Sequence, residues 1–170
     1  MTEAKILSSP PISGSIDEVH FAWAGNCTWV QFTDCEYEEW CGIFGQGEAS
    51  SANSSLVDAK GNCFVIAHGQ GYFININSRQ LTHKTENEWL ISAVSIPERD
   101  MFVACDWTNL YVYSDQGLLW QSQRVSVDGI IFTDVSKSQV KGQVWDLEEW
   151  VDFVLNVDGW TYSSEFECDF

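Results

Sequence analysis

The hydrophobic residues fall in short runs, and within several of them every second side chain is apolar. In the run GYFININ, Tyr72, Ile74 and Ile76 occupy alternate positions, while Asn75 and Asn77 fall on the other parity. Side chains two residues apart on a β-strand share a face of the sheet. The run therefore predicts a strand with one apolar face and one partly polar face.

Three more runs are rich in β-branched and aromatic residues, which favour strands. They are DMFVACDW (100–107), NLYVYS (109–114) and EWVDFVLN (149–156). Residues typical of tight turns stand between such runs, and we expect hairpin turns at 114–117, 127–129 and 157–159. One short segment, Cys35 to Trp40, predicts a helical turn. The pattern predicts an all-β chain.

The chain predicts one β domain over residues 16–170, after a loose N-terminal segment over residues 1–15. That segment contains Pro10-Pro11, four serines and Gly14, which is typical of an unstructured terminus. A chain of 170 residues is long enough for one domain with a real core.

The strand pattern repeats along the chain. Residues 64–75 align with residues 102–113 at an offset of 38, so that Phe64 meets Phe102 and Val65 meets Val103. A third copy begins at Gly142, and a fainter first copy covers residues 20–32. This unit of strand, turn and strand resembles the blade of a β-propeller, whose repeats run about 40–45 residues in the WD family. The resemblance covers residues 18–164 and implies an antiparallel meander of about four units, either a closed propeller, an open twisted sheet or a sandwich.

The charge is strongly negative and unevenly distributed. The formal net charge is −17, and segments 6–59 and 142–170 each contain eight acidic residues and no Lys or Arg. Nucleic acids and anionic membranes both bind basic surfaces, so direct binding to either is excluded as a function. No apolar run approaches the roughly 20 residues of a membrane span, and the N-terminus does not resemble a secretory signal. We therefore expect a cytoplasmic protein whose six cysteines are free thiols.

Two acidic stretches also carry aromatic residues, at 34–40 and 145–150. One interpretation is a solvated surface that keeps a Trp-rich β protein soluble. The other is a docking face for a basic protein, because aromatic residues surrounded by charge are typical of interface hot spots. If the first and last units lie side by side in the sheet, one face carries nearly all of the net charge. The second interpretation predicts these partner-binding residues: Asp34, Glu36, Glu38, Glu39, Trp40, Asp146, Glu148, Glu149, Trp150 and Asp152.

Residue patterns for catalysis are weak. His68, in the turn His68-Gly69-Gln70-Gly71, is the best candidate for acid–base chemistry, yet an ordinary turn residue explains it better. Adjacent carboxylates such as Glu38 and Glu39 point to opposite faces of a strand and cannot act together there. We predict no enzyme activity, no cofactor and no metal site. Most of the aromatic residues are expected in the core. Because Trp107, Trp120 and Trp160 stand near turns, a sugar-binding platform formed by them stays an alternative.

In its size, acidity and aromatic content, and in its lack of catalytic motifs, the chain resembles the immunity proteins of bacterial polymorphic and contact-dependent toxin systems. The resemblance implies a non-catalytic inhibitor that caps a basic toxin domain, often a nuclease. One alternative is a DNA-mimic inhibitor of a nucleic-acid enzyme, of the anti-restriction or anti-CRISPR type. Another is a blade-type repeat module for ligand binding or self-association. The sequence does not fix the oligomeric state.

Overall fold

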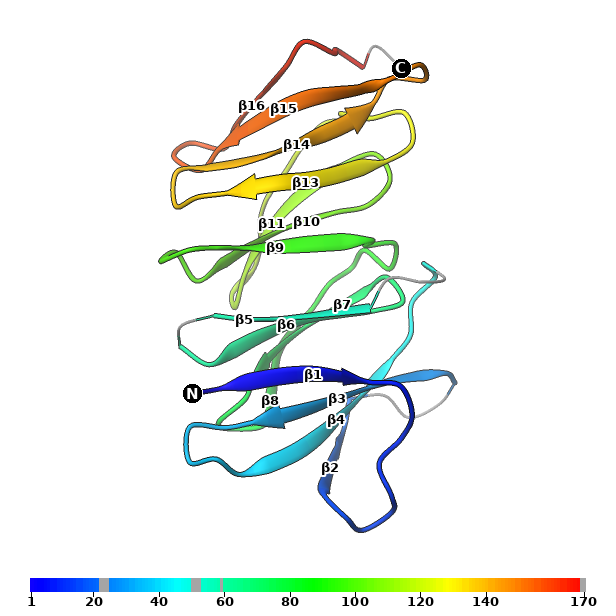
Figure 1. Cartoon of the computed structure of the whole chain (residues 1–170), viewed down its shortest axis with the longest axis vertical. Coiled ribbons are helices and arrows are strands. Elements are labelled where there is room, and N and C mark those ends of the chain that lie inside the picture. Colours follow the sequence, from blue (N-terminus) through cyan, green and yellow to red (C-terminus); the bar gives the residue numbers. More distant parts are fainter. Residues whose placement is uncertain (22–24, 50–52, 59, 169–170) are drawn as a thin grey trace. The chain divides into compact units, whose positions relative to one another are not determined.

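The computed structural model describes residues 1–21, 25–49, 53–58 and 60–168 (Figure 1). These residues contain no helix, and no described segment qualifies as a membrane-spanning helix. The prediction of an all-β chain of four units is confirmed, because the strands form four sheets of four strands each. The strands are β1 (Glu3–Leu7), β2 (Asp17–His20), β3 (Cys27–Thr33), β4 (Glu39–Gly45), β5 (Asn53–Val57), β6 (Asn62–Ala67), β7 (Gln70–Asn75), β8 (Gln80–Lys84), β9 (Ser92–Ile96), β10 (Met101–Cys105), β11 (Leu110–Ser114), β12 (Gly117–Gln121), β13 (Ile130–Val135), β14 (Gln139–Trp145), β15 (Trp150–Asn156) and β16 (Thr161–Ser164).

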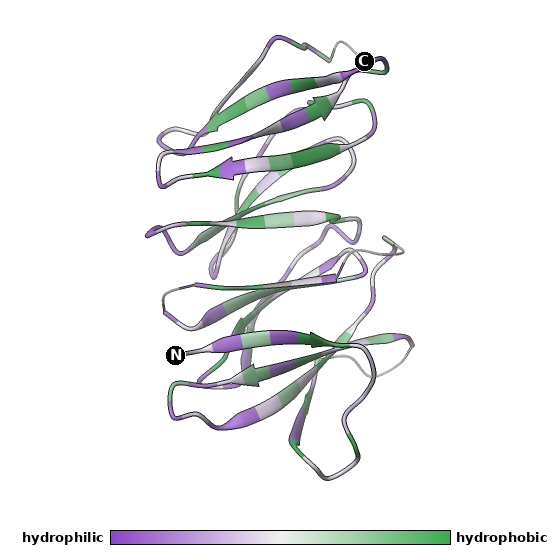
Figure 2. Ribbon diagram, in the orientation of Figure 1, coloured by the Kyte–Doolittle hydropathy of each residue, from purple (hydrophilic) through white to green (hydrophobic). Residues whose placement is uncertain are grey.

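The chain divides into two compact units, unit 1 (Met1–Leu90) and unit 2 (Ile91–Phe170), each with two sheets. In unit 1 the first sheet has the order β1-β3-β4-β2, and β2 runs parallel to β4 while the other pairs are antiparallel. The loose N-terminal segment predicted over residues 1–15 is wrong for its first part, because Glu3–Leu7 pairs with β3 along its whole length. The alternation of Ala4 and Ile6 with charged residues supplies an apolar face to this strand, as its colouring shows (Figure 2).

The second sheet of unit 1 has the order β5-β6-β7-β8. Apolar side chains from both sheets form the core of unit 1, with Phe32 and Trp40 from the first sheet and Val65 and Ile74 from the second. Tyr72, Ile74 and Ile76 all belong to this core, which confirms the face predicted from their spacing. Burial of these side chains removes apolar surface from water and is the main stabilising contribution.

Unit 2 also has two sheets of four strands, β12-β11-β10-β9 and β13-β14-β15-β16, and in both of them the strands follow one another in chain order with antiparallel pairing. Its core combines Val103 and Val112 of one sheet with Val144, Phe153 and Leu155 of the other. On the far side of the β13–β16 sheet, polar side chains pair across strands. Gln139 Nε2 donates to Asn156 Oδ1 at 3.0 Å, and Gln143 Nε2 donates to Asp152 Oδ1 at 2.9 Å. This sheet therefore has one apolar face and one polar face.

The repeat of 38 residues is a structural repeat. Val65 of β6 and Val103 of β10 occupy equivalent core positions in the central hairpins of their sheets. Their cross-strand partners are Tyr72 and Val112, so the second strands of the two hairpins are not related by the offset of 38, because the turn between β10 and β11 is longer than that between β6 and β7. The third copy coincides with the hairpin of β14 and β15. The first copy was misplaced. The central hairpin of the first sheet is β3–β4, and part of the proposed copy (22–24) lies outside the described residues.

Two of the three predicted hairpin turns are confirmed, at 114–117 between β11 and β12 and at 157–159 between β15 and β16. The third, at 127–129, instead lies in the connection from β12 to β13, which belong to different sheets. The predicted helical turn from Cys35 to Trp40 is also wrong, because a tight turn there is followed by β4, which begins at Glu39.

Candidate functional site

The acidic hairpin of unit 1, between β3 and β4, is closed by Asp34. Its Oδ1 accepts the backbone N–H of Glu36 at 2.8 Å and that of Glu38 at 3.0 Å. The N–H of Asp34 in turn donates to the carbonyl of Glu38. Because Asp34 is buried and its carboxylate is used inside the turn, its prediction as a partner-binding residue is corrected to a structural role.

Trp40 is a core residue and not a contact residue. Its side chain is fully buried, stacks on Phe32 with 4.4 Å between ring centroids, and donates its indole N–H to the carbonyl of Ile76 at 3.1 Å. The sequence suggested an exposed aromatic because acidic residues precede it. The strand β4 begins at Glu39, and its pleat turns the next side chain toward the core.

The remaining predicted residues of unit 1, Glu36, Glu38 and Glu39, are exposed. Glu38 and Glu39 line a shallow hollow of about 540 Å³ together with Asp17 and Tyr37. Tyr37 is 75% exposed and replaces Trp40 as the aromatic side chain of this stretch.

The acidic hairpin of unit 2, between β14 and β15, is built like that of unit 1. Asp146 Oδ1 accepts the backbone N–H groups of Glu148 and Glu149, both at 2.8 Å. These two bonds, with that from Glu149 the larger contribution, hold the pKa of the Asp146 carboxyl below its usual value. Leu147 adopts a positive φ of 96°, so the turn projects it outward and it is 62% exposed.

Four of the five residues predicted in unit 2 line one hollow of about 570 Å³. They are Asp146, Glu149, Trp150 and Asp152, and the hollow also includes Glu165 and Phe166, which the sequence argument missed. Glu148 is exposed beside it. We call this set, with Gln143 and Val151, the acidic hollow. Glu165 comes from the segment after β16, so only the return of that segment to β15 places it here.

Trp150 provides an aromatic surface in the acidic hollow. It is 40% exposed, and its ring lies 5.4 Å from that of Trp145, its partner across the strands. A Cβ on Gly129 would stand 3.0 Å from the Trp150 ring, so this glycine leaves room for the indole. Trp150 is thus held by packing while one part of it stays accessible.

The described residues that line the acidic hollow include no Lys or Arg. The ion pairs between described side chains include Arg79–Asp17, Arg99–Asp158 and Lys137–Glu98, and none of them uses a carboxylate of the hollow. The first and last acidic segments belong to separate sheets in different units, so the condition under which one sheet would carry nearly all of the net charge is not met. The hollow in unit 2 therefore has to be considered as a site by itself.

The candidates for other chemistry find little support in the described residues. His68 has a positive φ of 43° in the turn between β6 and β7, and its backbone N–H donates to Asn53 Oδ1 at 3.2 Å. No group of three His, Cys, Asp or Glu side chains within the described ranges is arranged to hold a metal ion. The six cysteines are free, and burial raises the thiol pKa of Cys41 to about 11 and raises those of Cys63 and Cys105 further.

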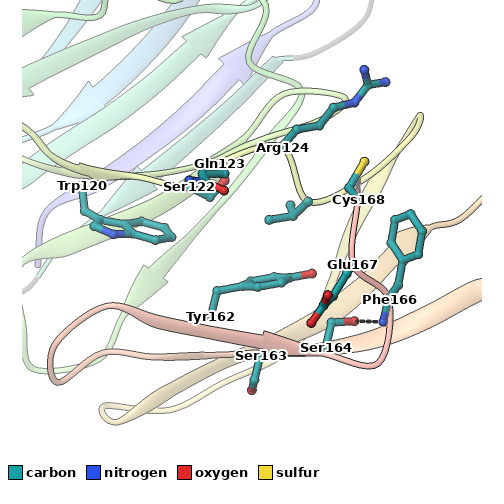
Figure 3. Close-up of a pocket in the computed structure, with 11 residues that line it drawn as sticks. Trp120, Ser122, Gln123, Arg124, Tyr162, Ser163, Ser164, Phe166, Glu167 and Cys168 are labelled. Atoms are coloured by element: carbon teal, nitrogen blue, oxygen red, sulfur yellow. Dashed lines mark hydrogen bonds between the residues drawn. The ribbon is translucent and has the colours of Figure 1, made fainter. Parts of the chain in front are cut away.

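A second cavity of unit 2, also of about 570 Å³, lies between the end of β12 and the segment that includes β16 (Figure 3). We call it the aromatic groove. Its main lining residues are Trp120, Arg124, Tyr162, Phe166 and Glu167. Of these, only Trp120 was singled out from the sequence, by its place near a turn. Phe166 lines both the groove and the acidic hollow.

Comparison with known proteins gives a fold but no family. No protein-family model and no curated protein matches the sequence. Among solved structures, the N-terminal domain of Nup159, a β-propeller, matches with a TM-score of 0.52 over 92% of this chain, at 9% sequence identity. The chain spans 45% of that protein, less than half of its length. This likeness supports sheets of the propeller-blade type and says nothing about function.

Proposed function

We propose that this protein is a non-catalytic binding module of blade-type sheets whose acidic hollow binds a basic protein. The observation that carries the proposal is the convergence of Asp146, Glu149, Asp152 and Glu165 around the half-exposed Trp150. Surface acids that serve solubility alone need no common location. These four come from two separated stretches of the chain and line the same hollow.

The combination of charge and an aromatic ring suits protein recognition. Carboxylates that take part in none of the ion pairs found among the described residues steer a basic partner toward the surface and set its orientation. A packed tryptophan supplies the apolar contact that commonly dominates binding energy. Because most of the attraction is electrostatic, association should weaken as salt rises. Residues 142–170 contain no Lys or Arg to oppose it.

The specific form that we favour is an immunity protein that neutralises a basic toxin domain, often a nuclease. The support for it is the likeness in size, acidity and lack of catalytic motifs. A DNA-mimic inhibitor would use the same carboxylates, so the identity of the partner separates the two roles.

The experiment is capture of partners from lysate of the source organism by the immobilised protein, at low and at high salt, followed by mass spectrometry. The affinity of a captured basic protein is then measured for the wild type and for the Glu149→Lys, Glu165→Lys double variant. We expect this variant to bind at least about tenfold more weakly, because both reversals place a repulsive charge in the hollow.

The matched control is the Glu86→Lys, Asp115→Lys double variant, which changes the net charge equally at exposed positions that do not line the hollow. It should bind within about threefold of the wild type, as expected for charges outside an interface. Equal loss in both variants would show that only net charge matters and would overturn the assignment to the hollow. A captured toxin whose activity the protein abolishes would support the immunity role.

A further inference from the structure

The aromatic groove is a separate feature that the proposed function does not use. It is bounded by the indole of Trp120 on one side and the phenol ring of Tyr162 on the other, and Phe166 and Glu167 close one end (Figure 3). All three aromatic side chains are partly buried and pack against the core of unit 2. Their positions are therefore fixed by tertiary packing before any ligand arrives.

Tyr162 and Phe166 are each held by a second contact. The Tyr162 ring stacks on core residue Phe153, with 5.7 Å between centroids. The backbone N–H of Phe166 donates to Ser164 Oγ at 3.2 Å, and Ser164 Oγ donates to the carbonyl of Asp152 at 2.9 Å. Rigid aromatic walls of this kind lose little conformational entropy on binding.

The polar groups of the groove favour a cation that carries N–H donors. Burial raises the pKa of the Tyr162 hydroxyl, and a side-chain interaction with Ser164 partly offsets that effect. The hydroxyl forms no hydrogen bond of standard geometry with the described protein atoms, so its oxygen retains the capacity to accept one from a ligand. Glu167 supplies a carboxylate at the same end (Figure 3). The aromatic residues Trp120, Tyr162 and Phe166 line the groove, and the face of an aromatic ring attracts organic cations through its quadrupole.

Arg124 is the one basic side chain among the described residues that line the groove, and two of its hydrogen bonds are made to backbone carbonyls of the connection that follows it. Its Nε donates to the carbonyl of Ser126 at 3.1 Å, and its Nη2 donates to the carbonyl of Val127 at 2.9 Å. The guanidinium points away from the space between Trp120 and Tyr162 (Figure 3). It therefore lies at the rim and leaves the inner part of the groove to the aromatic rings and Glu167.

We propose that the aromatic groove binds a primary ammonium group on an aliphatic chain. The chain lies along Trp120, Phe166 and Tyr162, and the ammonium group donates to Tyr162 Oη and pairs with Glu167. Such a group can come from a free alkylamine or from the lysine side chain of a protein. This site stands independently of the acidic hollow, because it is carried by different side chains apart from Phe166.

The test is an NMR titration of the full chain that follows the indole resonance of Trp120, assigned with the Trp120→Phe variant. The probes are n-pentylammonium, pentyltrimethylammonium and uncharged 1-pentanol, at physiological salt. We expect a saturable shift with n-pentylammonium and weaker binding of the trimethyl probe, which has no N–H to give to Tyr162. An absent shift with pentylammonium, or equal affinity for 1-pentanol, would overturn the proposal.

Two conservative variants locate the contacts. Tyr162→Phe should weaken n-pentylammonium about fivefold, the effect of one hydrogen bond, and should leave pentyltrimethylammonium unchanged. Glu167→Gln should weaken both cations by about fivefold or more, while the control Glu86→Gln, which removes the same charge from an exposed site, should change neither. If Glu86→Gln had the same effect as Glu167→Gln, the binding would reflect net charge and not this groove.

The source of the ammonium group is distinguished by two further probes. Tighter binding of 1,5-diaminopentane than of Nα-acetyl-lysine N-methylamide indicates a free amine. The reverse order indicates a lysine side chain presented by a protein. Neither probe depends on the basic partner of the acidic hollow, so failure of one proposal leaves the other standing.

Discussion

At the scale of single residues, several acids of this chain serve its turns. Asp34, Asp58, Asp106 and Asp146 each accept two backbone N–H groups from the residues that follow, in the turn between two strands. In this position the side chain replaces a missing backbone acceptor and fixes the turn. Part of the acidity that suggests a docking face is thus used to close hairpins.

The Asp34→Ala variant tests this role. It removes the buried carboxylate that accepts two backbone N–H groups. We expect the free energy of unfolding to fall by about 1–3 kcal/mol. Asp34→Asn keeps an oxygen in the same place and should recover most of the loss. Urea denaturation measures both, with Glu36→Ala in the same turn as the control, where about 0.5 kcal/mol or less is expected at an exposed site. A loss with Asp34→Asn as large as with Asp34→Ala would argue that the charge, not the turn, is what matters.

At the scale of strands and sheets, glycines inside strands make room for phenylalanine rings. A Cβ built on Gly71 would stand 2.7 Å from Phe64, and one on Gly142 would stand 2.5 Å from Phe153. At Gly142 the added atom would also come within 2.2 Å of the carbonyl oxygen of Ile131 on the neighbouring strand. Backbone atoms cannot move aside without disturbing the pairing of β13 with β14, so this glycine is required by the sheet.

We expect Gly142→Ala to destabilise unit 2 by about 2–4 kcal/mol, because the added methyl overpacks the sheet against backbone. The control is Lys141→Ala, the preceding and exposed position, for which a change of about 0.5 kcal/mol or less is expected. Chemical denaturation followed by tryptophan fluorescence measures both. A Gly142→Ala protein as stable as the wild type would mean that β13 can shift freely, contrary to the close packing described here.

At the scale of the whole molecule, the net charge of −17 opposes the folded state. Like charges brought together by folding repel one another, and the ion pairs found among the described residues have exposed or partly exposed side chains, which contribute little stability. The cores of the two units must offset this repulsion. The stability of the folded state should therefore rise with salt concentration, whereas a protein stabilised by a network of ion pairs would lose stability.

Sodium chloride should raise the melting temperature. Going from about 0.01 M to about 0.15 M shortens the screening length from about 30 Å to about 8 Å and reduces the repulsion between distant carboxylates. Calorimetry or circular dichroism at both concentrations measures the effect, and chloride is used because sulfate also strengthens apolar burial. A melting temperature that falls with salt would show that local ion pairs outweigh the overall repulsion. The same increase in salt is expected to weaken binding of a basic partner at the acidic hollow. The effect of salt on stability and its effect on binding therefore have opposite signs.

The sequence by itself determined the class of fold and much of its layout. Alternation at Tyr72, Ile74 and Ile76 identified a buried face, and the offset of 38 residues identified equivalent strands, because both depend on local periodicity that one sheet imposes on its own residues. It also located the acidic segment from which four residues of the hollow come.

Only the tertiary structure decided which of these residues can meet a partner. Trp40 and Asp34 stand in an acidic stretch yet are buried, because the register of β4 and the closure of the turn assign their side chains to the interior. Glu165 and Tyr162 were not predicted, because their neighbours in the two cavities are distant along the chain. The spacing of apolar residues shows which side chains share one face of a strand. A binding site depends instead on which strands and turns are brought together by tertiary packing.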